Sequence, residues 1–261
     1  MTAGEPVFAV YQVVVGRRRL PLRNCLLRGG DDGLVDFAYS LWVAIAGSSV
    51  ALIDSGFDEH VARRRGIDFE RTASQALREL DLEPADVSTI VLTHLHFDHA
   101  GGLDAFPNAK VYAQRADLDF YTGEFMRFRL CASAVEDADI ATVQRLRADD
   151  RLELLSGDAR IVDGVDALHI GGHTPGMQAV RLRTASSDLV LASDAAHLYA
   201  NLEAQVPFPV LHDVPTSCVA FERLAGLAAD GAIVVPGHDG AVMDRFERMT
   251  GRRAEFISRL G

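Results

Sequence analysis

A stretch of six residues that holds three histidines and one aspartate constrains this chain more than any other feature. The stretch reads His94-Leu95-His96-Phe97-Asp98-His99, with the apolar run Ile90-Val91-Leu92 before it and two glycines shortly after it. Histidine and aspartate side chains are nitrogen and oxygen ligands of transition metals. A buried strand that ends in such ligands holds a site on a rigid element. The sequence therefore predicts a metal site here rather than an exposed polar loop.

The spacing within this stretch predicts ligands for two metal positions. If the chain continues extended through Leu95, His94 and His96 point to the same side, because side chains alternate along a strand. Asp98 and His99 are adjacent, so the chain must bend before both can face a second position. The stretch cannot complete either ligand set, and further ligands must come from elsewhere in the chain.

Length, composition and charge narrow the class of protein. The chain has 261 residues, of which 48% are hydrophobic and 24% charged, as in ordinary globular proteins. No linker divides it, and we expect a single domain over residues 1–261. The net charge of −11 argues against nucleic acid as a partner, because phosphate contacts need clustered Lys and Arg. The basic clusters, Arg17-Arg18-Arg19 and Arg63-Arg64-Arg65, are interpreted as a hairpin tip and a solvated helix face.

Cysteine usage and hydropathy bear on the compartment. The three cysteines are far apart and form no CxxC pair, which argues against both a disulfide framework and a cysteine zinc site. The N-terminus lacks the pattern of a signal peptide, and no apolar run is long enough to span a membrane. We expect a cytoplasmic protein with reduced thiols. We also expect it to act on a small molecule and not to bind membranes. The sequence leaves the oligomeric state open.

Three later apolar runs also end in a histidine or an aspartate beside Gly, Ser or Pro. They are residues 165–170 before His173, residues 189–192 before Asp194, and residues 232–235 before His238. One such ending can occur by chance, but four endings with metal-compatible side chains indicate a shared metal site. A predicted helix at about residues 217–229 separates the last two strands, and this alternation indicates an α/β class.

The segments before the first motif predict strands, a hairpin and a helix. Residues 7–15 are rich in β-branched and aromatic side chains, and residues 41–46 and 50–53 predict a hairpin around a Gly-Ser-Ser turn. Asp54 ends the second of these strands. We interpret it as a turn former, with a partner of a metal-bound histidine as the alternative. Thr72 and Gln75 form a capping-box pattern, which predicts the start of a helix.

Residues 115–150 differ in character and leave two interpretations open. An aromatic group precedes a polar helical run over residues 136–151. The segment is either a helical insertion that packs on its own aromatics or a cap whose aromatics form an apolar pocket wall. The group consists of Phe120, Tyr121, Phe125, Met126 and Phe128. The remaining histidines are interpreted as solvated (His60), packed (His169) and lying on a surface loop (His212).

With these motifs in this order, the sequence resembles the metallo-β-lactamase superfamily from about residue 41 to residue 240. The resemblance implies a four-layer αβ/βα sandwich with a two-metal site at one edge of the sheets. It implies His94, His96 and His173 at the first metal. Asp98, His99 and His238 would hold the second metal, with Asp194 bridging the two and Asp54 orienting a ligand histidine. Seven ligands without sulfur suit two divalent ions, zinc first, with iron or manganese as alternatives.

Details of the motifs point to one branch of that family. Asp194 stands where well-known β-lactamases carry a cysteine, and His96 stands where the flavodiiron branch has a glutamate. The acidic chain lacks the basic surface of the branches that process nucleic acids. Residues 193–203 resemble the N-acyl homoserine lactonases and the pyridoxolactonase-type enzymes. Those enzymes carry a tyrosine three residues after the bridging aspartate, where this chain has His197.

The resemblance implies a hydrolase that opens a small lactone ring by attack of a metal-bridging hydroxide on the ester carbonyl. His197 would donate a hydrogen bond to the carbonyl oxygen, and Asp98 would pass a proton to the leaving alkoxide. The expected substrate is a neutral or weakly charged cyclic ester with an apolar portion. Alternatives are a thioesterase like glyoxalase II, a mononuclear iron enzyme like the persulfide dioxygenases, and a non-catalytic metal-binding module. Only about two dozen residues follow His238, fewer than the helical domain of glyoxalase II would need.

Overall fold

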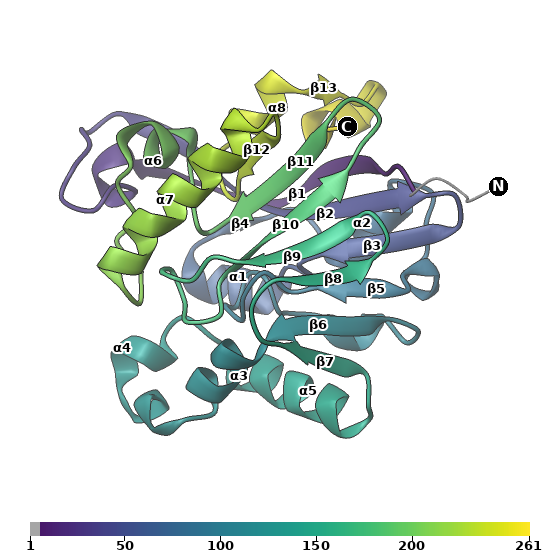
Figure 1. The fold of residues 1–261 in the computed structure, drawn as a ribbon, viewed down its shortest axis with the longest axis horizontal. Coiled ribbons are helices and arrows are strands. Elements are labelled where there is room, and N and C mark those ends of the chain that lie inside the picture. Colours follow the sequence, from purple (N-terminus) through teal and green to yellow (C-terminus); the bar gives the residue numbers. More distant parts are fainter. Residues whose placement is uncertain (1–5) are drawn as a thin grey trace.

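The computed structural model describes residues 6–261 as two β-sheets that face each other, with helices on their outer sides (Figure 1). The strands are β1 (Ala9–Pro21), β2 (Leu34–Ala46), β3 (Ser49–Ile53), β4 (Asp68–Phe69), β5 (Thr89–Val91), β6 (Lys110–Gln114), β7 (Leu152–Leu155), β8 (Ala159–Val162), β9 (Val165–His169), β10 (Gln178–Arg183), β11 (Asp188–Ser193), β12 (Ile233–Pro236), β13 (Glu247–Arg248) and β14 (Ile257–Arg259). The α-helices are α1 (Glu59–Arg65), α2 (Ala73–Arg78), α3 (Arg115–Tyr121), α4 (Arg129–Ala132), α5 (Asp137–Ala148), α6 (Tyr199–Ala204), α7 (Val214–Ala229) and α8 (Val242–Arg245).

The strand order shows how the chain builds each sheet. The larger sheet has the order β13-β14-β1-β2-β3-β5-β6-β7, with β4 paired to β1, and the smaller sheet has the order β12-β11-β10-β9-β8. Strands β3, β5, β6 and β7 run parallel to one another, as do β11 and β12. Carboxyl ends of parallel strands meet at one edge of a sheet. Both sheets can therefore present the loops that follow their parallel strands.

Apolar side chains fill three interfaces and so define four layers. Trp42 and Ile53 of the larger sheet pack with Val180 and Leu191 of the smaller sheet. The other face of the larger sheet packs on α1, α2 and α5, whose buried residues include Leu77 and Val143. Helix α7 covers the outer face of the smaller sheet through Phe221 and Leu224. This order of helix, sheet, sheet and helix confirms the predicted αβ/βα sandwich.

Local sequence patterns placed several elements correctly. Strands β2 and β3 form the predicted hairpin, with Ala46 opposite Ser49. Helix α2 begins at the predicted capping box, in which Gln75 N–H donates to Thr72 Oγ1 at 3.3 Å and Thr72 N–H donates to Gln75 Oε1 at 2.9 Å. Helix α7, residues 214–229, contains the helix predicted at about residues 217–229. The helices of residues 6–261 include none that is long and apolar enough to cross a membrane.

The first arginine triplet is not a hairpin tip, and that prediction is wrong. Strand β1 continues through all three arginines to Pro21, and residues 16–21 pair with residues 34–39 of β2. The register shifts between Val14 and Gly16, so a bulge lets the strand bend without ending. A Cβ added at Gly16 would lie 3.0 Å from the Phe57 ring and 3.1 Å from Ile67. The glycine permits this close approach inside the strand and does not mark a turn.

Candidate metal centre

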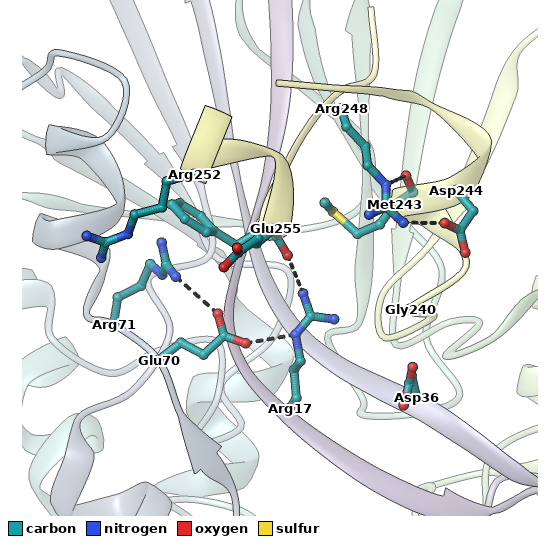
Figure 2. A pocket seen from close by; sticks show the side chains of 11 residues that line it. Arg17, Asp36, Glu70, Arg71, Gly240, Met243, Asp244, Arg248, Arg252 and Glu255 are labelled. Atoms are coloured by element: carbon teal, nitrogen blue, oxygen red, sulfur yellow. Dashed lines mark hydrogen bonds and ion pairs between the residues drawn. The ribbon is translucent and has the colours of Figure 1, made fainter. Parts of the chain in front are cut away.

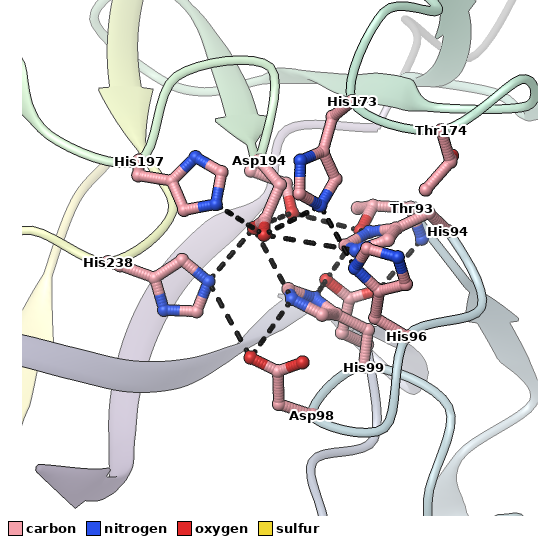
Figure 3. Close-up of polar contacts among 12 residues, drawn as sticks. Thr93, His94, His96, Asp98, His99, His173, Thr174, Asp194, His197 and His238 are labelled. Atoms are coloured by element: carbon pink, nitrogen blue, oxygen red, sulfur yellow. Dashed lines mark hydrogen bonds and ion pairs between the residues drawn. The ribbon is translucent and has the colours of Figure 1, made fainter. Parts of the chain in front are cut away.

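The seven predicted ligands converge in the folded chain at the ends of β5, β9, β11 and β12 (Figure 3). All seven are buried. Their potential ligand atoms form compact groups, and within each group the atoms lie no more than 4.8 Å apart. The first group contains His94, His96, His173 and Asp194, and the second contains Asp98, His99 and His238. These two groups match the two ligand sets that the family resemblance implies, and a third group joins Asp194 and His238 with His197.

Asp194 lies between the two groups and turns one carboxylate oxygen toward each. Its Oδ1 lies 2.9 Å from Nε2 of His238 and 3.3 Å from Nε2 of His99. Its Oδ2 lies 3.3 Å from Nε2 of His173 and 3.8 Å from Nε2 of His94. A carboxylate with one oxygen directed at each ligand set has the arrangement that bridging of two cations requires.

The unsatisfied atoms of the cluster fit a metal. Nε2 of His94 and Nε2 of His99 are buried and have no hydrogen-bond partner within residues 6–261. A buried polar atom without a partner costs free energy, and coordination of a cation would remove that cost. The donor atoms are imidazole nitrogens and carboxylate oxygens, which suit divalent transition metals. The residues present therefore fit a pair of such ions.

The electrostatics of the cluster also favour a bound cation. Burial lowers the pKa of His94 and of His173 well below the ordinary value, so both rings stay neutral and keep a free lone pair. Burial opposes protonation of His99 as well. The carboxylates of Asp98, Asp194 and Asp54 outweigh that effect and raise the pKa of His99 well above the ordinary value. The cluster attracts positive charge, which a metal ion would supply in place of the proton.

Asp54 contacts His99, as the alternative interpretation predicted, and its φ of 61° also gives it the left-handed conformation of a turn residue. Its Oδ2 lies 2.8 Å from Nδ1 of His99, and its Oδ1 accepts from the Thr93 backbone N–H at 2.7 Å. Two further candidate ligands have outer partners of the same kind. Nδ1 of His238 lies 2.9 Å from the Ala38 carbonyl oxygen, and Nδ1 of His94 lies 3.2 Å from Thr93 Oγ1. Such contacts hold the ring and its tautomer so that the other nitrogen faces the metal.

Asp117 joins the two loops that carry His94 to His96 and His173, and sequence reasoning missed it. Its Oδ2 accepts from the Leu95 N–H at 3.2 Å and from the Thr174 hydroxyl at 3.0 Å, while its Oδ1 accepts from the Gly176 N–H at 2.5 Å. Burial raises the pKa of Asp117 to about 6, although these donors oppose the shift. No local pattern singles out an aspartate in the first turn of α3. Only the tertiary fold brings it between the two loops.

A cleft of about 400 Å³ opens over the cluster and is walled by aromatic side chains. Asp98, His173, His197 and His238 lie at its base. The aromatics at this cleft are Phe37, Tyr39, Phe97 and Phe208. Sequence reasoning missed all four, because three lie in strands or loops distant from the motifs and Phe97 lies among the ligands.

A second, more apolar cavity of about 380 Å³ adjoins the cleft and shares His96 and His173 with it. Phe120 and Tyr121 line it, as the pocket-wall interpretation of residues 115–150 required. Phe125 and Phe128 are each 48% exposed and lie outside the lining, so including them in the wall was wrong. His212 was wrongly interpreted as a surface residue. It lines the cavity, and its ring lies 5.2 Å from that of Phe120.

The predicted carbonyl partner, His197, lies within the cluster. Its Nε2 lies 2.9 Å from Asp194 Oδ2. Its ring stacks on Phe208 with a centroid separation of 4.0 Å and an interplanar angle of 9°. Burial lowers the pKa of His197, so the ring is neutral near pH 7 and carries one N–H. His60 is exposed, and His169 packs with its Nε2 3.0 Å from the Pro175 carbonyl oxygen, so neither joins the cluster.

Comparison with known proteins decides the family. The model of the metallo-beta-lactamase superfamily matches residues 34–238. The chain belongs to this superfamily. An N-acyl homoserine lactonase of a Bacillus species is 32% identical over 249 residues, which cover 88% of this chain and 92% of that relative. An N-acyl homoserine lactonase of Bacillus cereus is 28% identical over 207 residues, which cover 72% of this chain and 76% of the relative.

Solved structures of the superfamily share the fold. One is an N-acyl homoserine lactone hydrolase with its product, N-hexanoyl-L-homoserine, bound at the catalytic metal centre. It superposes with a TM-score of 0.73 at 24% identity and covers 92% of this chain and 96% of its own. The dizinc quorum-quenching lactonase AidC superposes with a TM-score of 0.70 at 19% identity. The match covers 90% of this chain and 89% of the AidC chain. At these identities the likeness establishes the metallo-β-lactamase fold.

Proposed function

We propose that the protein is a metal-dependent hydrolase that opens the ring of a small lactone, with N-acyl homoserine lactones as its substrates and quorum quenching as the result. One observation carries this proposal. A buried set of seven nitrogen and oxygen ligands, shared through Asp194, lies at the base of a cleft with apolar walls. The relatives that carry the N-acyl homoserine lactonase name support the choice of substrate class.

We further propose zinc as the resident metal, with iron or manganese as alternatives. The ligand sets are the two groups described above. A pair of divalent ions supplies a water of lowered pKa and a Lewis acid for the carbonyl oxygen. The three cysteines are unpaired, which accords with the predicted cytoplasmic location.

The chain's own residues would position the lactone and move one proton. The cleft and the adjoining apolar cavity offer space for the ring and for an acyl chain, respectively. Water adds to the ester carbonyl carbon and gives one proton to the Asp98 carboxylate, the ring C–O bond breaks, and Asp98 passes that proton to the alkoxide oxygen. Asp98 can play this part because it lines the cleft, with its Oδ2 3.6 Å from Nε2 of His99 and 3.7 Å from Nε2 of His238. The carboxylic acid so formed loses its proton to solvent water. The product is a hydroxy carboxylate.

His197 is proposed to donate its N–H to the developing oxyanion. Its ring stacks on Phe208, and the one proton of the neutral ring lies on Nε2, where Asp194 Oδ2 accepts it at 2.9 Å. A cation held by Asp194 would occupy that carboxylate and so free the N–H for the oxyanion. His197→Phe keeps a ring and removes the donor, so kcat should fall by about 100-fold, the small end of measured oxyanion-hole effects, while KM changes little. Metal content must be measured alongside, because His197 also contacts Asp194. A loss of metal that accounts for the whole effect would assign His197 to holding that carboxylate instead.

The decisive test of the function is a substrate panel with the metal-loaded protein. The panel holds acyl-homoserine lactones of several chain lengths, simple γ-lactones, a glutathione thioester and a persulfide. We expect rapid lactone opening, followed by proton release, and little action on the thioester. Rapid thioester cleavage without lactone opening would select the thioesterase alternative. Oxygen uptake with the persulfide would select the dioxygenase alternative.

A further inference from the structure

The middle arginine of the first triplet faces the metal cleft. Side chains alternate along a strand, and Arg18 and Leu20 of β1 line the cleft together with Phe37 and Tyr39 of β2. The two flanking arginines are directed away from the cleft and meet acids there. Arg17 Nε lies 2.7 Å from Glu70 Oε1, and Arg19 Nε lies 3.4 Å from Asp36 Oδ1.

Arg18 differs from its neighbours because its charge is not neutralised by an ion pair. Within residues 6–261 no carboxylate oxygen lies within 4.0 Å of its guanidinium, which donates to the Arg65 carbonyl oxygen at 3.5 Å. The other arginine of the cleft, Arg65, is paired with Glu136 at 2.7 Å and covers the Phe97 ring at 3.8 Å. Arg18 is thus the cation of this cleft that remains available to a ligand.

Tyr39 complements Arg18. Both side chains line the cleft. A guanidinium can only donate hydrogen bonds, whereas a phenol can donate or accept one, so both can donate to an oxygen atom of a ligand. Tyr39 also lies beside the metal cluster, with the centres of its ring and the His238 ring 5.4 Å apart and the ring planes at 75°.

We propose that Arg18 and Tyr39 form a subsite for an oxygen-bearing substituent on the lactone, namely a carbonyl or carboxylate oxygen outside the ring. The two side chains offer a cationic donor and a neutral donor in the cleft that holds the metal ligands, and both suit an oxygen acceptor. The subsite rests on the proposed lactonase function and adds a specificity to it. Lactones with such a substituent are preferred over lactones with a plain alkyl chain.

The test compares three γ-butyrolactones that differ in the substituent alone: an alkyl chain, an acylamido chain and a chain that ends in a carboxylate. Arg18→Gln removes the cation and keeps a polar side chain. Arg19→Gln is the matched control, because Arg19 is exposed, pairs with Asp36 and lies outside the cleft lining. Arg18→Gln should lower kcat/KM for the acylamido and carboxylate lactones by about 10-fold, mainly through KM. The alkyl lactone and the control variant should be unchanged.

The outcomes separate this subsite from the proposed function. If Arg18→Gln lowers kcat/KM for the carboxylate lactone alone, and salt suppresses the difference, the subsite binds anions. That result would support the proposal for a carboxylate oxygen and exclude it for a carbonyl oxygen. An equal effect of Arg18→Gln on all three lactones, or no effect on any, would overturn the subsite while lactone hydrolysis stands. If the metal-loaded wild type opens none of the three rings, the lactonase function fails and the subsite fails with it. Tyr39→Phe provides a second variant. It should lower kcat/KM for the same lactones as Arg18→Gln does, by a smaller factor.

Discussion

Two clefts of this protein are lined by charged side chains, and they differ in how those charges are satisfied. In the cleft of about 500 Å³ between β1 and the C-terminal segment (Figure 2), several of the charges form ion pairs with one another. Glu70 contacts Arg17 at 2.7 Å and Arg71 at 3.1 Å, and Arg248 pairs with Asp244. Arg71, whose Nε has no hydrogen-bond partner, lies over the Phe256 ring at 3.2 Å.

The metal cleft is smaller, and its polar side chains are buried and only partly satisfied by one another. Six histidines and two aspartates are buried there, and Nε2 of His94 and Nε2 of His99 have no hydrogen-bond partner within residues 6–261. Paired charges at a surface stabilise local packing by a small amount. Buried and unsatisfied ligand atoms cost free energy until a cation binds. The comparison teaches that burial of unsatisfied ligand atoms, and not cavity size, distinguishes the metal cleft from the charged one.

The largest effect should come from the residue that both ligand groups share. Asp194→Asn replaces one carboxylate oxygen by an amide N–H₂, which cannot bind a cation, so affinity for both ions should fall. Loss of the activated water should lower kcat/KM by on the order of 10³-fold or more. Metal content and kinetics of the purified variant check this. Full metal content with near-normal turnover would show that Asp194 does not join the two groups.

A smaller loss of activity is expected when Asp54, the carboxylate that contacts His99, is replaced. Asp54→Asn keeps the shape but weakens the contact with Nδ1 of His99, so metal affinity or activity should fall by about 10- to 100-fold. Competition with a chelator measures the affinity, and kinetics at matched metal loading measure the activity. A loss equal to that of Asp194→Asn would mean that one of the two roles is misassigned.

The smallest effect on activity should come from the charged cleft. Glu70→Gln removes the carboxylate that holds Arg17 and Arg71 together. The free energy of unfolding should fall by about 1 kcal/mol, as for partly exposed ion pairs. Chemical denaturation measures that change. The kinetics of lactone opening should match the wild type, and a large loss of turnover would show that the two clefts are coupled.

The ligands could be predicted from the sequence because each follows an apolar strand run, and such runs with a final His or Asp are visible locally. The contacts that hold the ligands in place could be predicted only for Asp54, through the family resemblance. Asp117 contacts residues far away in the chain, Tyr39 reaches the cleft only through the fold, and neither lies in a recognisable pattern. The arginine triplet was misplaced because pairing with β2, rather than local composition, sets the length of β1. His212 was misjudged because only the folded chain brings its loop against α3.

The central claim is that the buried cluster holds two metal ions in each chain. Elemental analysis by mass spectrometry tests it most directly, on protein that has been saturated with zinc and then dialysed against metal-free buffer. We predict two zinc ions per chain for the wild type, and a reduction to about one for His238→Ala, which removes a ligand of the second group and none of the first. A reproducible stoichiometry of one in the saturated wild type would contradict the account.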